Sequence, residues 1–358
     1  MTRVNIEANK LLASFTTLGV GGPARFFAVV QNENEIEEVV SWASRRRLPL
    51  FVLGGGSNLL VSDDGFDGLV LQVGLKGIHV RDVDHGEGVY EVAAGEDWDH
   101  FVQRAVDDDR AGIECLAGIP GTVGGTPVQN VGAYGQEVAT TINRVRAFDL
   151  RELSFAEFTA AECGFAYRHS RFNTRDKDRY VITRVDYQLI PGGAPTLKYA
   201  ELQRSFPLDS NPTLGEVAEA VRRIRQCKGM LLVEGDEDCR SAGSFFKNPV
   251  VSENQAANVA SVARSEPPRF PAGPGLHRMI KLPAAWLIEK AGFAKGYSLG
   301  RAGISHKHTL ALVNRGGATS AEILALACCI RTAVTEKFGI DLQMEPVMLG
   351  FQKDSAES

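Results

Sequence analysis

Two glycine-rich segments in the first half of the chain could bind a phosphate-bearing cofactor. Gly54-Gly-Gly-Ser-Asn58 lies between two short apolar runs, and Gly118-Ile-Pro-Gly-Thr-Val-Gly-Gly125 lies within residues 117–135, which contain six glycines and two prolines. Backbone N–H groups that no side chain covers form concave nests for anions, and for diphosphates in particular. One such loop is more often an ordinary turn, but two in one region favour a site for a large cofactor.

Three further groups of residues could act on a substrate. Tyr167-Arg168-His-Ser-Arg-Phe172 supplies guanidinium groups, which suit a carboxylate or a phosphate. Ser241-Ala-Gly-Ser-Phe-Phe-Lys-Asn-Pro249 combines hydroxyl, aromatic, ammonium and amide groups, as the wall of a pocket would. Glu345 stands among apolar residues, where burial without a partner would raise its pKa and make it an acid near neutral pH. The ordinary alternatives are a surface charge for Arg168, a turn entering a strand for Ser244 and a solvated strand residue for Glu345.

Two other motifs match functional patterns by letter only. Gly19-Val-Gly-Gly-Pro-Ala24 has the letters of a Rossmann dinucleotide loop. However, Ser14–Thr17 before it is not a buried strand, and Arg25–Val30 after it is typical of a strand rather than the helix that such a loop requires. His306-Lys-His308 resembles a metal-binding pair, but no carboxylate or cysteine stands at ligand spacing, so no metal site is expected.

The elements that must position these residues mix helices and strands. Ile36, Val39, Val40 and Ala43 recur at helical spacing and predict a helix over 34–46. The same kinds of pattern and capping signal predict further helices at 98–105, behind Thr213–Glu216, and near 253–264, 284–291 and 320–338. Strands are expected at Leu50–Leu53, Leu59–Val61, Leu69–Val73, Val89–Ala94, 141–150 and 180–189. The proline-rich stretch 266–275 is predicted to be neither helix nor strand.

Composition limits the classes of function. The chain has 358 residues, of which 44% are hydrophobic and 23% charged, and its net charge is −5, so we expect a globular protein with no nucleic-acid partner. No apolar run is long enough to insert into a membrane, and Met1–Glu7 lacks the apolar region of a secretory signal. We therefore expect a cytoplasmic protein. The six cysteines form no Cys-x-x-Cys pair, and Cys328 and Cys329 are expected to be reduced core thiols in a helix.

Together and in this order, the motifs resemble the UDP-N-acetylenolpyruvoylglucosamine reductase family of peptidoglycan precursor synthesis. The resemblance runs from about Phe15 to Gly350 and depends on the joint occurrence of the segments above with Gln129-Asn-Val-Gly-Ala-Tyr-Gly135. It implies an α+β fold with a vanillyl-alcohol-oxidase-type FAD-binding domain. That domain would have two α/β subdomains, 1–72 and 73–212, followed by a smaller α/β substrate-binding domain, 213–350, and a tail, 351–358.

The resemblance implies an enzyme that uses FAD and NADPH. NADPH would be the hydride donor, and FAD would mediate the reduction of UDP-N-acetylglucosamine enolpyruvate to UDP-N-acetylmuramate. The first glycine loop would hold the FAD diphosphate and the second would lie along the flavin. Because Ser57 and Asn58 follow the glycines where some flavoproteins have a histidine tether, the FAD should be non-covalent. No obligate protein partner is indicated. The implied cofactor contacts are Gly54, Gly55, Gly56, Ser57, Asn58, Ile119, Pro120, Gly121, Thr122, Gly124 and Thr126.

The resemblance also assigns catalytic roles. Arg168 would stabilise negative charge on the substrate carboxylate, and Glu345 would donate a hydrogen bond to the same oxygens. Ser244 would place a proton on C2. The implied substrate contacts are Tyr199, Lys228 and Asn248. One position departs from the family pattern: Phe270 stands in a lid loop where a tyrosine often reaches the substrate diphosphate, and it has no hydroxyl.

Two other functions stay open at this point. The flavin fold would equally suit an oxidase of alcohols or sugars, which oxygen would reoxidise quickly without a sugar nucleotide. A non-catalytic sensor of nucleotide sugars would keep the pocket and lack bound flavin. The joint presence of Arg168, Ser244 and Glu345 argues against the sensor.

Overall fold

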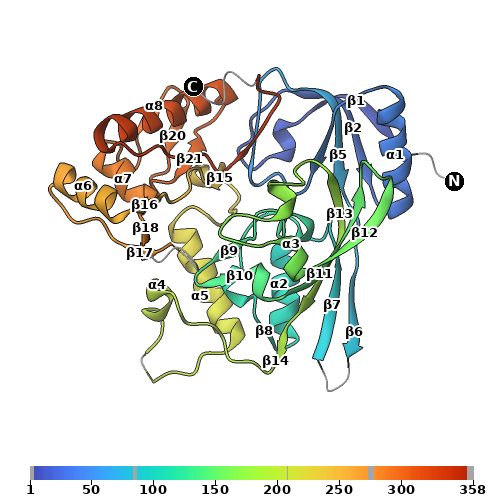
Figure 1. Cartoon of the computed structure of the whole chain (residues 1–358), viewed down its shortest axis with the longest axis horizontal. Coiled ribbons are helices and arrows are strands. Elements are labelled where there is room, and N and C mark those ends of the chain that lie inside the picture. Colours follow the sequence, from blue (N-terminus) through green and yellow to red (C-terminus); the bar gives the residue numbers. More distant parts are fainter. Residues whose placement is uncertain (1–3, 84–86, 208, 273–277, 353–358) are drawn as a thin grey trace. The chain divides into compact units, whose positions relative to one another are not determined.

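The computed structural model describes residues 4–83, 87–207, 209–272 and 278–352 (Figure 1). The chain divides into two compact units, each built from segments that are distant in sequence. The first unit draws on residues 1–10, 24–56 and 67–226, and the second on residues 11–23, 57–66 and 227–358. The subdomain boundaries expected at residues 72, 212 and 350 stay predictions.

Two sheets form the framework of the first unit. One has four strands in the order β1-β2-β5-β3, and the other has five antiparallel strands in the order β12-β11-β13-β7-β6. Figure 1 shows the long strands β6, β7, β13, β11 and β12 running beside one another. The strands of the first sheet are β1 (Ile6–Leu11), β2 (Pro23–Val30), β3 (Leu50–Leu53) and β5 (Phe66–Val73). Those of the second are β6 (Ile78–Val83), β7 (Glu87–Ala93), β11 (Ile142–Asp149), β12 (Ser154–Thr159) and β13 (Tyr180–Gln188).

Five helices and two short strand pairs complete the first unit. Helix α1 buries the predicted face of Ile36, Val39, Val40 and Ala43, so the expected helix is confirmed. One apolar core joins buried residues of both sheets to those of α1, α2 and α5. The helices are α1 (Glu33–Arg45), α2 (Trp98–Asp107), α3 (Ala160–Cys163), α4 (Ala200–Gln203) and α5 (Leu214–Cys227). The short pairs are β8 (Arg110–Ala111) with β14 (Ile190–Pro191), and β9 (Gly132–Ala133) with β10 (Gln136–Glu137).

The second unit packs three helices against small sheets. Its sheets have the orders β15-β21-β20-β19 and β16-β18-β17, and β22 pairs with β4 in parallel. Helix α8 begins and ends where predicted, because Thr319 and Glu322 form a capping box and Gly339 ends the helix at φ 68°. The helices are α6 (Glu253–Ala263), α7 (Ala284–Lys290) and α8 (Ser320–Phe338). The strands are β4 (Leu59–Val61), β15 (Ser241–Ser244), β16 (Val250–Ser252), β17 (Phe270–Pro271), β18 (Met279–Lys281), β19 (Ser298–Leu299), β20 (Ala302–Ile304), β21 (Ala311–Asn314) and β22 (Val347–Leu349).

Two local predictions are wrong. Within the proline-rich stretch, Phe270 and Pro271 form a two-residue edge strand opposite Lys281 and Ile280. An edge strand tolerates proline because one side of its ladder needs no N–H donor. Residues 273–275 of that stretch lie outside the described residues.

The core-thiol prediction for helix α8 is also wrong. Cys329 is exposed and Cys328 is only partly buried, although both thiols are free. The buried stripe of α8 instead runs through Leu326, Ala327 and Ile330. Residues 328 and 329 therefore lie toward the other side of the helix.

Two broader expectations can also be compared with the fold. The Rossmann motif is excluded as predicted, because the residues that follow Gly19–Gly22 form strand β2 rather than a helix. Across the described ranges, no helix combines the length and apolar character needed to cross a membrane.

Candidate active site

The two glycine-rich segments meet inside the first unit. Gly54 and Gly55 directly follow strand β3. A Cβ atom added to Gly55 would lie 2.6 Å from the Cα of Gly121, and one added to Gly54 would lie 2.9 Å from the Oγ1 of Thr122. The two loops therefore approach backbone to backbone, which only glycine permits. We call this pair of loops the cofactor cradle, because its glycines leave the backbone uncovered by side chains, as binding of the phosphates of a dinucleotide requires.

The second glycine loop, Gly118–Gly125, is fixed to the five-stranded sheet and to helix α2. The backbone N–H of Gly124 donates to the carbonyl of Ala94 at 2.8 Å, and that of Val123 donates to Glu96 at 2.9 Å. A Cβ atom at Gly124 would lie 2.6 Å from the Cβ of Ala94. The backbone N–H of Trp98, the first residue of α2, donates to the carbonyl of Gly121 at 3.1 Å. The sheet thus determines where this loop lies.

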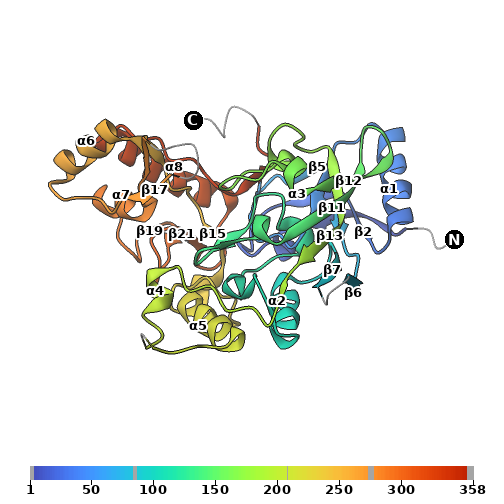
Figure 2. The ribbon, with the colours of Figure 1, turned by 60° about the horizontal axis from the view of Figure 1, so that its bottom comes forward.

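Polar side chains from α2 and α5 hold Gly118 at both of its peptide groups. Its N–H donates to Oδ1 of Asp99 at 2.6 Å, and its carbonyl accepts from Nε of Arg225 at 2.9 Å. Arg222 pairs with the same Asp99 carboxylate, with Nη2 and Oδ1 2.8 Å apart. Two views place α5 beside α2, as these contacts require (Figure 1, Figure 2). We call these three charged residues the Gly118 clamp.

Sequence reasoning missed this clamp. Arg225 is only 8% exposed. Burial lowers its pKa from the ordinary value, and electrostatic interactions with Tyr134 and Asp99 oppose that shift. One signal could have revealed it: Arg225 continues the apolar stripe of Val217 and Val221 at a spacing of four residues. An arginine at a core position of an amphipathic helix needs a buried partner.

The other predicted cofactor contacts have varied surroundings. Thr126 is buried, and its hydroxyl lies 2.8 Å from the carbonyl of Val123 and 2.6 Å from the hydroxyl of Tyr187. Ile119, Pro120, Gly121, Thr122 and Gly124 are partly exposed, and so are Gly54, Ser57 and Asn58, while Gly56 is buried. Contact of each with the cofactor stays a prediction.

Arg168 lies in the first unit, in a tight turn with unusual backbone geometry. Ala166 and His169 exchange two backbone hydrogen bonds of 3.0 Å across this turn. Arg168 has φ 54°, and its Nη2 donates to the carbonyl of Gly132 at 3.1 Å. A left-handed conformation is unfavourable for a residue with a side chain and often marks a functional position. The turn fixes the backbone of Arg168, and its functional role stays a prediction.

Ser244 and Glu345 lie in the second unit on segments that pair with each other. Ser244 ends strand β15 opposite Ala311 of β21. The next residue, Phe245, is fully buried, and its carbonyl accepts a hydrogen bond from the backbone N–H of Glu345 at 2.9 Å. The Asn58 side chain donates to the carbonyl of Glu345 at 3.3 Å. Glu345 is partly buried and precedes strand β22 rather than lying within it.

The predicted substrate contacts are divided between the units. Tyr199 lies in the first unit and is exposed, with its ring edge-to-face against Tyr134 at 5.3 Å between centroids. Lys228 and Asn248 lie in the second unit. The side-chain oxygen of Asn248 accepts from the backbone N–H of Ala284 at 2.9 Å and so caps helix α7, which fixes the orientation of its amide.

Two letter motifs in the second unit have no matching geometry. Gly296-Tyr-Ser-Leu-Gly300 has the letters of a nucleophile elbow. However, Ser298 lies on a two-residue strand that turns into another strand, not into a helix. His306 receives a hydrogen bond of 3.2 Å from Arg315. Among the described residues, no three His, Cys, Asp or Glu side chains are grouped as metal ligands would be.

Two family models match the chain. The C-terminal domain of UDP-N-acetylenolpyruvoylglucosamine reductase matches residues 235–349, and an FAD binding domain matches residues 24–151. The match to the FAD binding domain includes both glycine loops.

Relatives match almost the whole chain. A UDP-N-acetylenolpyruvoylglucosamine reductase from Thermobifida fusca is 48% identical and covers 96% of this chain and 97% of its own. One from Streptomyces coelicolor is 45% identical and covers 95% of this chain and 89% of its own. The crystal structure of a UDP-N-acetylenolpyruvylglucosamine reductase from Thermus caldophilus is 27% identical, covers 97% of this chain and 99% of its own, and gives a TM-score of 0.65. The expected α+β fold with an FAD-binding domain is confirmed.

Proposed function

The chain belongs to the UDP-N-acetylenolpyruvoylglucosamine reductase family, and from that premise we propose that it reduces UDP-N-acetylglucosamine enolpyruvate to UDP-N-acetylmuramate with NADPH as the hydride donor. The similarity over nearly the full length of the chain carries this proposal. The meeting of the two glycine loops supports it independently, because the first unit thereby has the cradle that a dinucleotide needs.

FAD is the cofactor, and the two glycine loops are the segments that would hold it. When bound, FAD carries a hydride from NADPH to the enolpyruvyl group. The chain's task is to bind and orient it. Residues 54–58 contain no histidine or cysteine, so this loop has no side chain for a covalent tether. We therefore propose non-covalent FAD.

Arg168 is proposed to bind the carboxylate of the enolpyruvyl group. An enol ether is electron-rich and resists hydride addition, so the adjacent carboxylate must accept negative charge as C3 is reduced. A guanidinium that binds this charge more strongly in the transition state than in the ground state accelerates the step. The turn that fixes the Arg168 backbone reduces the reorganisation this requires.

Ser244 and Glu345 are proposed to complete the reaction. Ser244 would donate the proton that adds at C2, and Glu345 would donate a hydrogen bond to the substrate carboxylate. A hydroxyl is a weak acid, so it can act only on a strongly basic carbon held at a fixed distance. The anchoring of Ser244 between strand β21 and buried Phe245 supports this role.

Tyr199, Lys228 and Asn248 are proposed as contacts to the substrate diphosphate and neighbouring groups. Phe270 belongs to the proposed lid and is 49% exposed. It has no hydroxyl for a hydrogen bond, and adjacent Arg269 pairs with Glu253 and Glu266 at 3.2 Å. We propose that the lid covers the substrate without a direct bond from position 270.

We also propose that the protein acts in the cytoplasm, in peptidoglycan precursor synthesis and thereby in cell-wall biogenesis, cell shape and cell division. Its substrate is a nucleotide sugar and its proposed reductant is NADPH. The free cysteines support a reducing compartment.

One anaerobic experiment tests the reaction. The purified protein is reduced with NADPH, the nicotinamide is removed, and UDP-N-acetylglucosamine enolpyruvate is added while the flavin absorbance is followed. Rapid return of the oxidised spectrum is the expected result. Flavin that stays reduced with the sugar nucleotide but is reoxidised quickly by oxygen would contradict the proposal and indicate an oxidase.

A further inference from the structure

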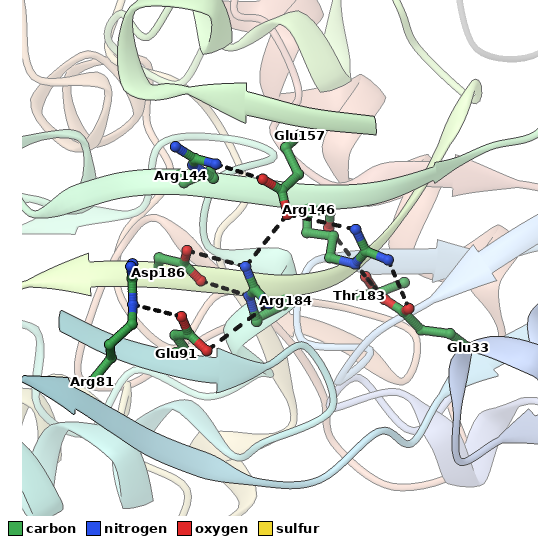
Figure 3. Close-up of polar contacts among 9 residues, drawn as sticks. All are labelled: Glu33, Arg81, Glu91, Arg144, Arg146, Glu157, Thr183, Arg184 and Asp186. Atoms are coloured by element: carbon green, nitrogen blue, oxygen red, sulfur yellow. Dashed lines mark hydrogen bonds and ion pairs between the residues drawn. The ribbon is translucent and has the colours of Figure 1, made fainter. Parts of the chain in front are cut away.

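A network of charged side chains crosses the five-stranded sheet of the first unit (Figure 3). Within the sheet, Arg81 pairs with Glu91 at 3.0 Å, and Arg184 pairs with Asp186 at 2.8 Å. Further pairs join Arg184, Arg144 and Arg146 to Glu157 at 3.5, 2.6 and 3.5 Å. Acidic and basic groups alternate, so the sheet network neutralises itself and offers no charged patch to a partner.

One member of the network, Glu33, does not belong to this sheet. It is the first residue of helix α1, which connects strands β2 and β3 of the other sheet. Its carboxylate accepts two hydrogen bonds from Arg146, from Nε at 2.8 Å and from Nη2 at 3.0 Å. It accepts a third from the hydroxyl of Thr183 at 2.8 Å (Figure 3). Glu33 therefore ties the first sheet layer to the second through a charge-assisted, bidentate contact.

The contact is built for a charged carboxylate. Partial burial alone would raise the pKa of Glu33, but the hydrogen bonds from Arg146 and Thr183 outweigh burial and the pKa is lowered. Thr183 is only 2% exposed, so water cannot readily replace Glu33 as the hydrogen-bond partner of its hydroxyl.

Thr183 connects this contact to the second glycine loop. The main-chain carbonyl of Thr183 accepts a hydrogen bond from the N–H of Ala94 at 2.9 Å. The carbonyl of Ala94 in turn accepts from the N–H of Gly124 at 2.8 Å. Two peptide groups thus separate the residue that Glu33 binds from the glycine loop.

The first glycine loop is connected to helix α1 through strand β3. Residues 46–49 link α1 to β3, and Gly54 directly follows the last residue of β3. A Cβ at Gly55 would lie 2.6 Å from the Cα of Gly121, so the two loops are in backbone contact with no room for a side chain between them. A small shift of one sheet layer against the other would change the shape of the cofactor cradle.

We propose that Glu33 is a positioning residue for FAD: by binding Arg146 and Thr183 it fixes the two sheet layers of the first unit against each other and so sets the spacing of the two glycine loops. This inference rests on the proposed function only in taking FAD as the resident cofactor. It assigns a cofactor-positioning role to a carboxylate outside the loops that would touch FAD.

The test measures FAD affinity rather than turnover. Glu33→Gln removes the charge and keeps the shape, and Glu91→Gln makes the same change at a carboxylate that pairs only within the sheet. Equilibrium dialysis should give an FAD dissociation constant about tenfold higher for E33Q, as expected for the loss of one charge-assisted contact. E91Q should remain within about twofold of the parent, because the pairs of Glu91 with Arg81 and Arg184 lie within one sheet and do not join the two layers.

A second pair of variants tests the route through Thr183. Thr183→Val removes the hydroxyl and should weaken FAD binding, whereas Thr183→Ser keeps it and should bind nearly as the parent does. The double variant E33Q/T183V should bind FAD no more weakly than E33Q alone does, because both changes break the same contact. This pair also carries the test if E33Q fails to fold.

Three results would overturn the inference. One is equal weakening by E33Q and E91Q. Another is a lower thermal midpoint of the E33Q apoprotein with an unchanged FAD dissociation constant, which would indicate a purely structural role. The third is identical FAD affinity in T183V and T183S. A parent protein that binds no FAD would contradict the proposed function as well, so the two failures are distinguishable.

Discussion

The first unit and the second hold their candidate functional residues by different means. In the first, buried or half-buried charges fix the backbone, as Arg225 does at Gly118. In the second, Ser244 and Glu345 are held by backbone pairing beside the fully buried ring of Phe245. Where charged side chains position the backbone, removing a charge or changing its protonation should lower stability or cofactor affinity. Where packing and strand pairing do it, only changes of volume or of the reacting group itself should matter.

The largest expected effect lies in the second unit. Ser244→Ala should leave reduction of the flavin by NADPH unchanged and slow its reoxidation by the sugar nucleotide about 10³-fold, the range for loss of a proton donor. Stopped-flow absorbance measures both halves. Ser298→Ala, an exposed serine of the same sheet, is the control and should change neither half. Equal slowing of both halves by S244A would show that Ser244 is not the proton donor.

The next effect concerns the close approach of the two glycine loops. Gly55→Ala places a methyl group 2.6 Å from the Gly121 backbone and should raise the FAD dissociation constant about 100-fold, because backbone cannot move aside as a flexible side chain can. The flavin content of the purified protein and equilibrium dialysis measure this. Gly215→Ala, in helix α5 with room for a methyl group, should retain full flavin content. Normal FAD binding by G55A would mean that the loop spacing does not define the cradle.

The Gly118 clamp allows the contribution of a buried arginine to be compared with that of a more exposed one. Arg225→Met should lower the free energy of unfolding by about 2 kcal/mol, since it removes a charged hydrogen bond to Gly118 and leaves that carbonyl buried. Arg222→Met, which breaks the more exposed pair with Asp99, should cost less than about 1 kcal/mol. Urea unfolding of both variants provides the comparison. Equal losses would contradict the distinction.

The last expected effect is a pH dependence of the stability of the first unit. Asp149 pairs with Arg179 at 2.7 Å. Burial alone would raise its pKa, but hydrogen bonds from Arg179 and from the N–H groups of Arg151 and Glu152 outweigh burial and lower the pKa to about 2. Because the folded-state pKa lies below that of the unfolded chain, about 4, the stabilisation is complete above pH 4 and is lost as pH falls toward 2.

Asp149→Asn should therefore cost at most about 2 kcal/mol of unfolding free energy near pH 7. Below pH 4 the difference in unfolding free energy between the variant and the parent should become smaller. Thermal unfolding at a series of pH values measures it. A gap that does not change between pH 7 and pH 2 would mean that the ion pair contributes nothing through its charge.

Much of the local structure could be predicted from the sequence. Helix α8 has the predicted bounds because its caps and its apolar period are local signals. The family, the cofactor and the candidate residues Arg168, Ser244 and Glu345 could be proposed from motifs that are contiguous in the chain. The two cysteines of α8 were misplaced, because apolar character in a helix does not tell which face is buried.

Contacts between distant segments were decided by the tertiary structure. Strands β3 and β4 are separated by only five residues, yet β3 pairs with β5 in the first unit and β4 with β22 in the second. The closeness of Gly55 to Gly121, the contact of Arg225 with Gly118 and the tie from Glu33 to Thr183 join residues that are 66, 107 and 150 positions apart. Periodicity, capping and contiguous motifs report only on residues that are close in the chain. The sequence by itself therefore determined the local elements and the family, and it allowed the reacting groups to be proposed. Which backbone they lie against was settled only when the sheets packed and brought those segments together.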